Sequence, residues 1–257
     1  MLAVIGMAVF GSFVKVWPYN LSFTLNHYTY GFEEAGVENA YRNSLTMAAW
    51  CALIGALLTF AGAYWLEKTR GADLVRPIVR LQAMLPMAIP GLVLGIGYIL
   101  FFNHPANPLN VLYGTMGILV LSTIVHFYSS SHLTAVTALK QLDNEFESVS
   151  ASLKVPFYKT FWRVTVPVCL PSIIDISRYY FVNAMTTISA VVFLYSPKTM
   201  LAAISIVQLD EAGAIGSAAA MATLIVVTSG VVTLLSFAVE GWLLRRTQGW
   251  RRAAPTR

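Results

Sequence analysis

Charged residues are scarce in this sequence. Asp, Glu, Lys and Arg make up 11% of the 257 residues, whereas hydrophobic residues make up 57% and the mean hydropathy is +0.65. Soluble proteins carry about 25% charged residues, so this composition excludes an ordinary soluble domain and indicates a polytopic membrane protein. Cysteine is also rare. Cys51 and Cys169 are too few for a disulfide framework, and we expect two unpaired thiols.

Catalytic and nucleotide-binding motifs are missing as well. The sequence has no Gly-Lys pair, which excludes a phosphate-binding loop of the Walker type. It has neither His-Glu-x-x-His nor Gly-x-Ser-x-Gly. The chain is therefore predicted not to be an enzyme and to need no cofactor of its own. Any energy from ATP must come from nucleotide bound by another chain.

Six apolar stretches predict an all-α fold with six transmembrane helices, residues 1–257 forming one transmembrane domain. The stretches are 1–16, 45–66, 81–102, 112–133, 173–195 and 214–239. Asn43 and Ser44 give the second stretch an N-cap signal, and Trp17-Pro18-Tyr19 indicates an interfacial anchor that ends the first. The first stretch is short and has no basic leader. Either the native start lies upstream of Met1 or this helix is clipped; a signal peptide is the competing interpretation.

Several stretches contain residues that are unusual in a membrane span. Pro86 and Pro90 bend the third stretch, either to line a solute path or as packing geometry alone. His126 is either a functional residue or a satisfied packing residue. Asp175 and Arg178 are spaced to pair across one helical turn.

The middle of the fifth stretch is the most polar part of any span. Its hydroxyl and amide side chains are candidates for a solute path: Asn183, Thr186, Thr187 and Ser189. On an ideal helix the first three of them share one face. Polar residues on one face are also common in contacts between membrane helices, so both interpretations stay open.

The basic residues are concentrated on one side of the predicted spans. Fourteen of the 17 Lys and Arg residues fall in three segments: 67–80, 137–178 and 244–257. Only Lys15, Arg42 and Lys198 fall on the other side. By the positive-inside rule both termini and the loop over about 137–172 are cytoplasmic, and residues 20–40 lie outside. This placement accounts for the sequence pI of about 9.2 without nucleic acid.

The longest polar interval runs from Leu142 to Ser172. Four of its apolar residues recur at helical spacing: Leu142, Phe146, Val149 and Leu153. Pro156 should end that helix. The helical spacing resumes at Phe157, Phe161 and Val164, and Pro167 and Pro171 close the segment. Two short amphipathic helices therefore meet at an elbow. Because isolated helices this short are marginal in water, they need a surface to lie against.

The spacing of this interval resembles the EAA loop of permease subunits of binding-protein-dependent ABC importers. That loop has Glu-Ala-Ala, three residues, Gly, nine residues and Ile-x-Leu-Pro. Here Val164–Pro167 occupies the closing position, Lys154 stands where the family has Gly, and Ser148–Ser150 stands where it has Glu-Ala-Ala, with Glu147 one position early. An ordinary amphipathic loop is the plainer alternative.

The resemblance implies the type I ABC importer permease fold and a coupling loop, residues 137–172, that docks on an ATPase. The residues expected to dock are Phe146, Glu147, Val149, Leu153, Lys154, Pro156 and Phe157. Lys154 either makes a charged contact that the rest of the family would lack or is a solvated residue at the rim of the interface.

Other stretches resemble particular branches of these permeases. Pro86–Tyr98 is similar to the iron(III)-type branch, and three segments resemble permeases for 2-aminoethylphosphonate uptake: Ser152–Phe157, Phe181–Pro197 and Leu209–Gly213. The resemblance implies import of a small solute across the bacterial inner membrane, 2-aminoethylphosphonate first, with iron(III) or another anion as the alternative. It also implies the partners: cytoplasmic ABC ATPase subunits, a second permease copy (identical or related), a periplasmic substrate-binding protein and the lipid membrane, with no nucleic acid.

Two functions of other classes compete with the importer. One is a membrane scaffold or receptor subunit that transports nothing, and the other is an ion-coupled secondary transporter. Ion-coupled carriers usually place ionisable residues in the middle of their spans, and here those regions hold essentially none apart from His126. Co-purification with a soluble ATPase would separate the importer from both.

Overall fold

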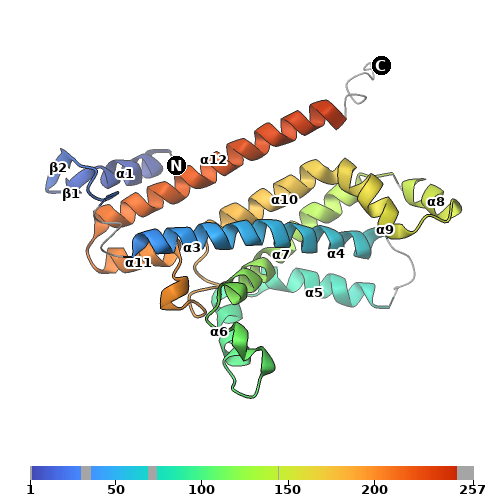
Figure 1. The fold of residues 1–257 in the computed structure, drawn as a ribbon, viewed down its shortest axis with the longest axis horizontal. Coiled ribbons are helices and arrows are strands. Elements are labelled where there is room, and N and C mark those ends of the chain that lie inside the picture. The colour runs from blue at the N-terminus through green and yellow to red at the C-terminus, as the bar shows by residue number, and fades with distance from the viewer. Residues whose placement is uncertain (1, 30–35, 69–73, 144, 248–257) are drawn as a thin grey trace. The chain divides into compact units, whose positions relative to one another are not determined.

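The computed structural model describes residues 2–29, 36–68, 74–143 and 145–247, and it is built almost entirely of helices (Figure 1). The α-helices are α1 (Leu2–Ser12), α3 (Val37–Trp50), α4 (Ala56–Lys68), α5 (Arg76–Ala88), α6 (Gly91–Phe102), α7 (Met116–Lys140), α8 (Glu145–Ser152), α9 (Phe157–Thr160), α10 (Val166–Thr186), α11 (Ala202–Glu211) and α12 (Ile215–Thr247). Single π turns at Cys51–Gly55 and Phe161–Thr165 and 3-10 turns at Pro108–Leu112 and Pro197–Thr199 complete the helical part.

A small hairpin is the exception to the all-α prediction. Strands β1 (Val14–Val16) and β2 (Asn20–Phe23) pair antiparallel, and Trp17-Pro18-Tyr19 lies in the connection between them. The first predicted span therefore ends at Ser12. It is a short apolar helix of 11 residues, and the hairpin follows it directly.

The chain divides into two compact units. The first unit comprises Met1–Trp50, Pro90–Thr123 and Phe181–Val231, and the second comprises Cys51–Ile89, Ile124–Tyr180 and Val232–Arg257. Four of the five crossings between them fall inside continuous helical segments, because α7, α10, α12 and the α3–α4 segment each contribute residues to both units.

In the first unit, side chains of α3 hold the chain that enters α11. The Asn43 amide donates to the carbonyls of Lys198 and Met200 at 2.9 and 3.0 Å, and the Ser44 hydroxyl accepts from the Ala202 amide at 2.8 Å. The predicted N-cap role of Asn43 and Ser44 is therefore wrong. The helix begins at Val37, inside the segment predicted to be an outside loop, and these side chains satisfy backbone groups of another element instead.

The second unit is organised around Tyr180, whose side chain is fully buried. The π turn at Cys51–Gly55 brings Gly55 against the phenol ring; a Cβ at Gly55 would lie 2.9 Å from two ring carbons. The Thr59 and Tyr180 hydroxyls are 2.8 Å apart, so the buried phenol has a hydrogen-bond partner. Glycine at position 55 therefore makes room for a large polar aromatic side chain in the core.

The third predicted span is not one helix. It is divided into α5 and α6, because Ile89 and Pro90 have extended backbone angles. One turn before this break, the Ser129 hydroxyl of α7 donates to the Ala83 carbonyl at 2.8 Å and accepts from the Met87 amide at 3.2 Å. These two groups are four residues apart, so a buried side chain serves a donor and an acceptor that would pair with each other in a regular helix.

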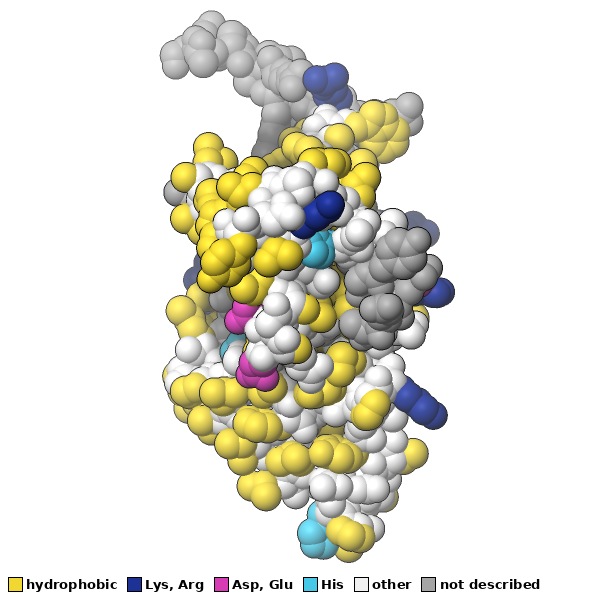
Figure 2. All heavy atoms as spheres, turned by 90° about the vertical axis from the view of Figure 1, so that its left-hand side faces the viewer, with side chains coloured by type: hydrophobic (Ala, Val, Ile, Leu, Met, Phe, Trp, Pro, Cys, Tyr) yellow, Lys and Arg dark blue, Asp and Glu magenta, His cyan; other side chains and the backbone are white. Residues whose placement is uncertain are grey.

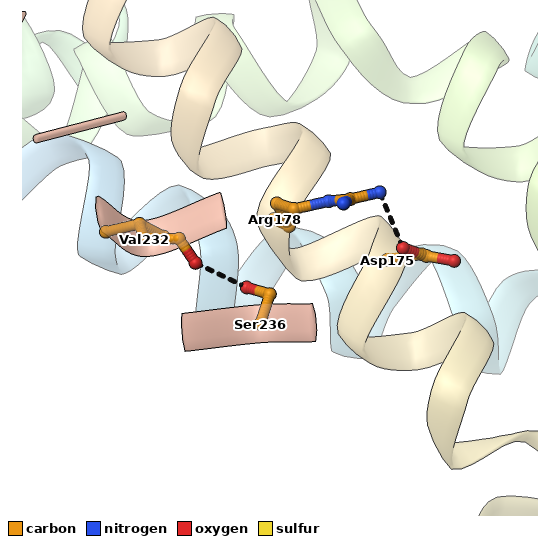
Figure 3. Close-up of polar contacts among 4 residues, drawn as sticks. All are labelled: Asp175, Arg178, Val232 and Ser236. Carbon is orange, nitrogen blue, oxygen red and sulfur yellow. Dashed lines mark hydrogen bonds and ion pairs between the residues drawn. The ribbon is translucent and has the colours of Figure 1, made fainter. Parts of the chain in front are cut away.

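The predicted pair of Asp175 and Arg178 is confirmed. Arg178 Nη2 donates to Asp175 Oδ1 at 2.7 Å within α10 (Figure 3). The guanidinium also lies 4.5 Å from the ring centroid of Phe237 on α12, a cation–π contact. In the same view the Ser236 hydroxyl donates to the Val232 carbonyl within α12, so it needs no partner outside its own helix.

Large apolar side chains cover much of the surface, as Figure 2 shows for one face. This exposure suits a bilayer, where apolar side chains contact lipid rather than water. Among the described residues, two helical segments are long and apolar enough to cross a membrane, Val37–Lys68 and Ile215–Arg245. A third results if α5 and α6, which are bent at their break, form one span. The predicted number of six spans is not confirmed.

Candidate functional site

The segment predicted to be a coupling loop forms an elbow in the second unit. Helix α8 ends at Ser152, and α9 begins at Phe157 with Pro156 as its N-cap residue, so the predicted break is at the right place. The predicted end of the second helix is wrong. Helix α9 continues through the π turn at Phe161–Thr165 into α10, and Pro171 lies inside that helix. The later part of the loop is thus a direct extension of a long helix.

Lys154 occupies a special backbone position in this elbow. Its φ is 53°, and it is the only described residue other than glycine with a positive φ. The Val155 amide donates to the Ser150 carbonyl at 2.9 Å, the six-to-one bond of a Schellman motif, so Lys154 is the left-handed residue that follows the helix. Glycine is the usual residue there, because a Cβ in this conformation costs about 1 kcal/mol or more.

The elbow is fastened to the rest of the second unit by contacts that the sequence did not predict. The buried Thr160 hydroxyl donates to Ser150 Oγ at 2.9 Å, which ties α9 to α8. The ring centroid of Phe161 lies 4.7 Å from the ring centroid of Tyr64 and 6.0 Å from that of Phe60, both on α4. Phe161 and Phe157 are four residues apart, but Phe161 packs inward whereas Phe157 is exposed.

The predicted docking side chains form an exposed apolar patch on this elbow. The exposed fractions of Phe146, Val149, Leu153 and Phe157 are 47%, 56%, 70% and 64%. The sequence missed two neighbours on the same elbow, Tyr158 and Trp162, which are 53% and 59% exposed. We call these six residues the apolar patch. Lys154 is exposed beside them, and the side chain of Glu147 lies outside the part that the structure describes.

The candidate solute-path residues lie at the end of α10 in the first unit. The helix stops at Thr186, not at Tyr195, so Thr187 and Ser189 follow it in a turn-rich segment. The expected common face of Asn183, Thr186 and Thr187 is therefore wrong for Thr187, which is buried outside the helix. Thr186 is exposed, and its hydroxyl reaches the carbonyls of Val182 and Asn183 at 3.2 and 3.3 Å.

The segment after Thr186 is packed closely within the first unit. Ala190, Val191 and Leu194 are fully buried. The Ser122 hydroxyl of α7 donates to the Ala190 carbonyl at 2.8 Å, and a Cβ at Gly95 of α6 would lie 3.2 Å from the Phe193 ring. Non-helical backbone at membrane depth requires such cover, because lipid cannot satisfy its polar groups.

Among the described residues, no group of three or more His, Cys, Asp or Glu side chains could hold a metal ion. His126 makes an edge contact with the neighbouring Phe127 ring, with the ring centroids 4.6 Å apart, but its Nδ1 is buried without a hydrogen-bond partner in the structure, so both interpretations of this histidine stay open. The two candidate functional features in the described residues are the apolar patch and the hydroxyl-bearing end of α10.

Comparisons with known proteins show which family the chain belongs to. Residues 60–248 match the family described as "Binding-protein-dependent transport system inner membrane component". The chain is 31% identical over 235 residues to a ferric transport system permease protein, FbpB, of Actinobacillus pleuropneumoniae, covering 90% of this chain and 34% of that protein. It is 26% identical over 213 residues to a putative 2-aminoethylphosphonate transport system permease protein, PhnV, of Salmonella paratyphi A, covering 83% and 77%. The chain spans about a third of the length of the FbpB ferric permeases that it matches.

Solved structures share the fold. A bacterial ABC transporter that imports the acidic polysaccharide alginate contains a chain that matches with a TM-score of 0.76 at 16% identity, over 93% of this chain and 89% of that one. The alginate transporter in complex with its periplasmic protein matches with a TM-score of 0.73 at 17% identity, over 91% and 85%. The chain therefore shares the overall fold of these chains.

Proposed function

Because the chain belongs to the family of binding-protein-dependent transport system inner membrane components, which are permeases of ABC transporters and not enzymes, we propose that it is one permease subunit of an ABC importer, driven through the coupling loop by a separate ATPase. The observation that carries this proposal is the apolar patch on a fastened elbow. An exposed apolar patch is typical of a protein or membrane interaction site, and the matched family favours a protein partner here.

The contacts of the elbow favour a mechanism in which the elbow and α10 move together. Phe161 is packed against α4, and the later half of the elbow continues without interruption into α10. A partner that moved the apolar patch would thus move α10, whose other end carries the candidate solute-path residues. In this mechanism the ATPase subunits switch residues 1–257, as one transmembrane domain, between inward-open and outward-open states. A second permease copy and a periplasmic binding protein complete the importer.

The proposal is tested by Leu153→Glu in the full chain, co-expressed with the ATPase. A carboxylate without a partner in an apolar interface costs several kcal/mol, so we expect the variant to enter the membrane but to lose the ATPase on purification. Gln141→Glu adds the same charge at an exposed polar position of the loop and should retain it. Normal retention and transport by Leu153→Glu would show that the loop does not dock.

The basic segments motivate a proposed orientation with both termini cytoplasmic and residues 20–40 outside. A cysteine introduced at Gln248 should then resist an impermeant thiol reagent in intact cells and react after permeabilisation. Reaction in intact cells would contradict this orientation.

Two solutes each have an observation in their favour. The identity of 31% to a ferric permease supports iron(III). The match over 77% of a putative 2-aminoethylphosphonate permease supports the phosphonate. So do the amide and hydroxyl groups near the end of α10, since ferric ion prefers carboxylate and phenolate oxygen. We keep the phosphonate as the first candidate.

Growth of a deletion strain separates the two solutes. Failure on 2-aminoethylphosphonate as sole phosphorus source, with normal growth on phosphate, would support the phosphonate. A defect in iron-limited medium alone would support ferric ion instead.

A further inference from the structure

His132 of α7 is buried in the second unit without a use for its polar atoms. The residue is 2% exposed, and both ring nitrogens are buried with no hydrogen-bond partner among the described residues. One of these nitrogens carries a proton in either tautomer of the neutral ring, so a buried donor is left unsatisfied. Such a donor is rare and destabilising, because it has lost its hydrogen bond to water and gained none from the protein.

Aromatic packing holds the His132 ring in place. It stacks on the ring of Tyr128, one turn earlier in α7, with the centroids 5.4 Å apart and the planes inclined by 20°. The Tyr128 hydroxyl in turn lies against α4 at Gly62, where a Cβ would be 2.7 Å from its oxygen. Glycine at this position therefore allows the ring that supports His132 to approach α4 closely.

The carboxylate near this ring already has a partner. Glu67, in the last turn of α4, accepts from Arg80 Nη2 of α5 at 2.8 Å. Both members of the pair are close enough to the His132 ring to interact with it electrostatically. They differ in exposure, since the Glu67 side chain is 13% exposed and that of Arg80 is 58% exposed. On losing the pair, Arg80 would therefore be solvated, whereas Glu67 would need another donor.

The same end of α4 is bound to the chain that enters the elbow. Lys68, next to Glu67, donates from Nζ to the Leu142 carbonyl at 3.3 Å, a few residues before α8. Two consecutive residues of α4 thus contact the first half of α5 and the entry to the elbow. A displacement of the elbow would reach the Glu67–Arg80 pair through this contact.

We propose that Glu67 exchanges partners, leaving Arg80 and accepting a hydrogen bond from the His132 ring when the start of α5 moves away from α4. The exchange gives the buried imidazole an acceptor and leaves the guanidinium to solvent, so each state keeps Glu67 paired. A partner that favours one of these states shifts the population between them. That the ATPase does so through the elbow rests on the proposed function.

The test is NMR spectroscopy of the purified full chain with isotope-labelled histidine, in micelles and without the ATPase. His132→Phe keeps an aromatic ring on Tyr128 and assigns the His132 signal by its absence. Arg80→Gln releases Glu67, so the His132 N–H should exchange with solvent at least about 10-fold more slowly than in the unmodified chain, as expected for a hydrogen bond to a carboxylate. Glu67→Ala/Arg80→Gln should abolish this protection.

Two controls separate the exchange of partners from a general change in the fold. Arg80→Lys keeps a cation for Glu67 and should leave the exchange rate within about twofold. His126 reports on the fold in the same spectra, because its Nδ1 is also buried without a partner among the described residues and its signal should stay unchanged. Protection of His132 in the unmodified chain, an unchanged rate in Arg80→Gln, or protection that persists without Glu67 would each overturn the proposal.

A second arm tests the link to the ATPase separately. With the ATPase and a non-hydrolysable ATP analogue, His132 of the unmodified chain should become protected as it is in Arg80→Gln. Protection in Arg80→Gln with no effect of the ATPase would support the exchange of partners and contradict the proposed role of the elbow.

Discussion

The surroundings of Tyr180 and the apolar patch on the elbow are both rich in apolar and aromatic side chains. In the first region these side chains are buried, whereas in the second they are exposed. Tyr180 is fully buried, its hydroxyl is paired with Thr59, and a glycine on the neighbouring helix makes room for its ring. The side chains of the apolar patch are about half to more than two thirds exposed. The first region stabilises the chain by itself, whereas the second can contribute little until a partner covers it. Substitutions should therefore separate folding from assembly.

The largest effect is expected from Tyr180→Ala. Removal of a buried aromatic side chain costs about 3–5 kcal/mol, and the Thr59 hydroxyl would lose its buried partner. Phe157→Ala removes a similar ring from the apolar patch and should change the free energy of unfolding by less than about 0.5 kcal/mol. Denaturant titration in mixed micelles measures both. The comparison fails if Phe157→Ala destabilises the isolated chain as much as Tyr180→Ala does.

A second variant changes the glycine that faces the Tyr180 ring. Gly55→Ala would place a Cβ 2.9 Å from the Tyr180 ring, and overpacking of this kind costs about 1–3 kcal/mol. Gly97→Ala is its control, because a Cβ there meets nothing within 4 Å. That change should be neutral or stabilising by up to about 1 kcal/mol through helix propensity. If Gly55→Ala left the free energy of unfolding unchanged, as is expected for Gly97→Ala, the close approach of Gly55 to the Tyr180 ring would not be needed to accommodate that ring.

The same contrast explains what could be predicted from the sequence. The helical spacing of Phe146, Val149 and Leu153 and the position of Pro156 predicted the elbow, because periodicity and proline act locally. The Asp175–Arg178 pair was predictable for the same reason, since three residues bring the two side chains together on any helix.

Long-range contacts could not be predicted in this way. Asn43 and Ser44 carry a strong local capping signal, but their partners lie more than 150 residues away, in the chain that enters α11. Phe161 has the spacing of the docking face, and only its contact with Tyr64 shows that it packs inward. The end of α10 at Thr186 is set by the packing of the following segment against α6 and α7, which apolar composition alone does not indicate.

The smallest expected effect concerns Lys154, because this residue has a strained backbone conformation and is also a predicted docking residue. Lys154→Gly removes the Cβ from a left-handed position and should stabilise the end of α8 by about 0.5–1 kcal/mol. The Val155 amide, which bonds to the Ser150 carbonyl, should then exchange with solvent hydrogen about 2- to 5-fold more slowly.

Lys154→Asn removes the charge but keeps a residue that tolerates this conformation, and Lys154→Ala removes the charge and keeps the strain. If the lysine makes a charged contact with the ATPase, all three variants should bind it more weakly by a similar factor. If it makes none, affinity should follow the amide exchange rate, with Lys154→Gly at least as tight as the unmodified chain. Slower exchange in Lys154→Ala than in Lys154→Gly would contradict the backbone explanation altogether.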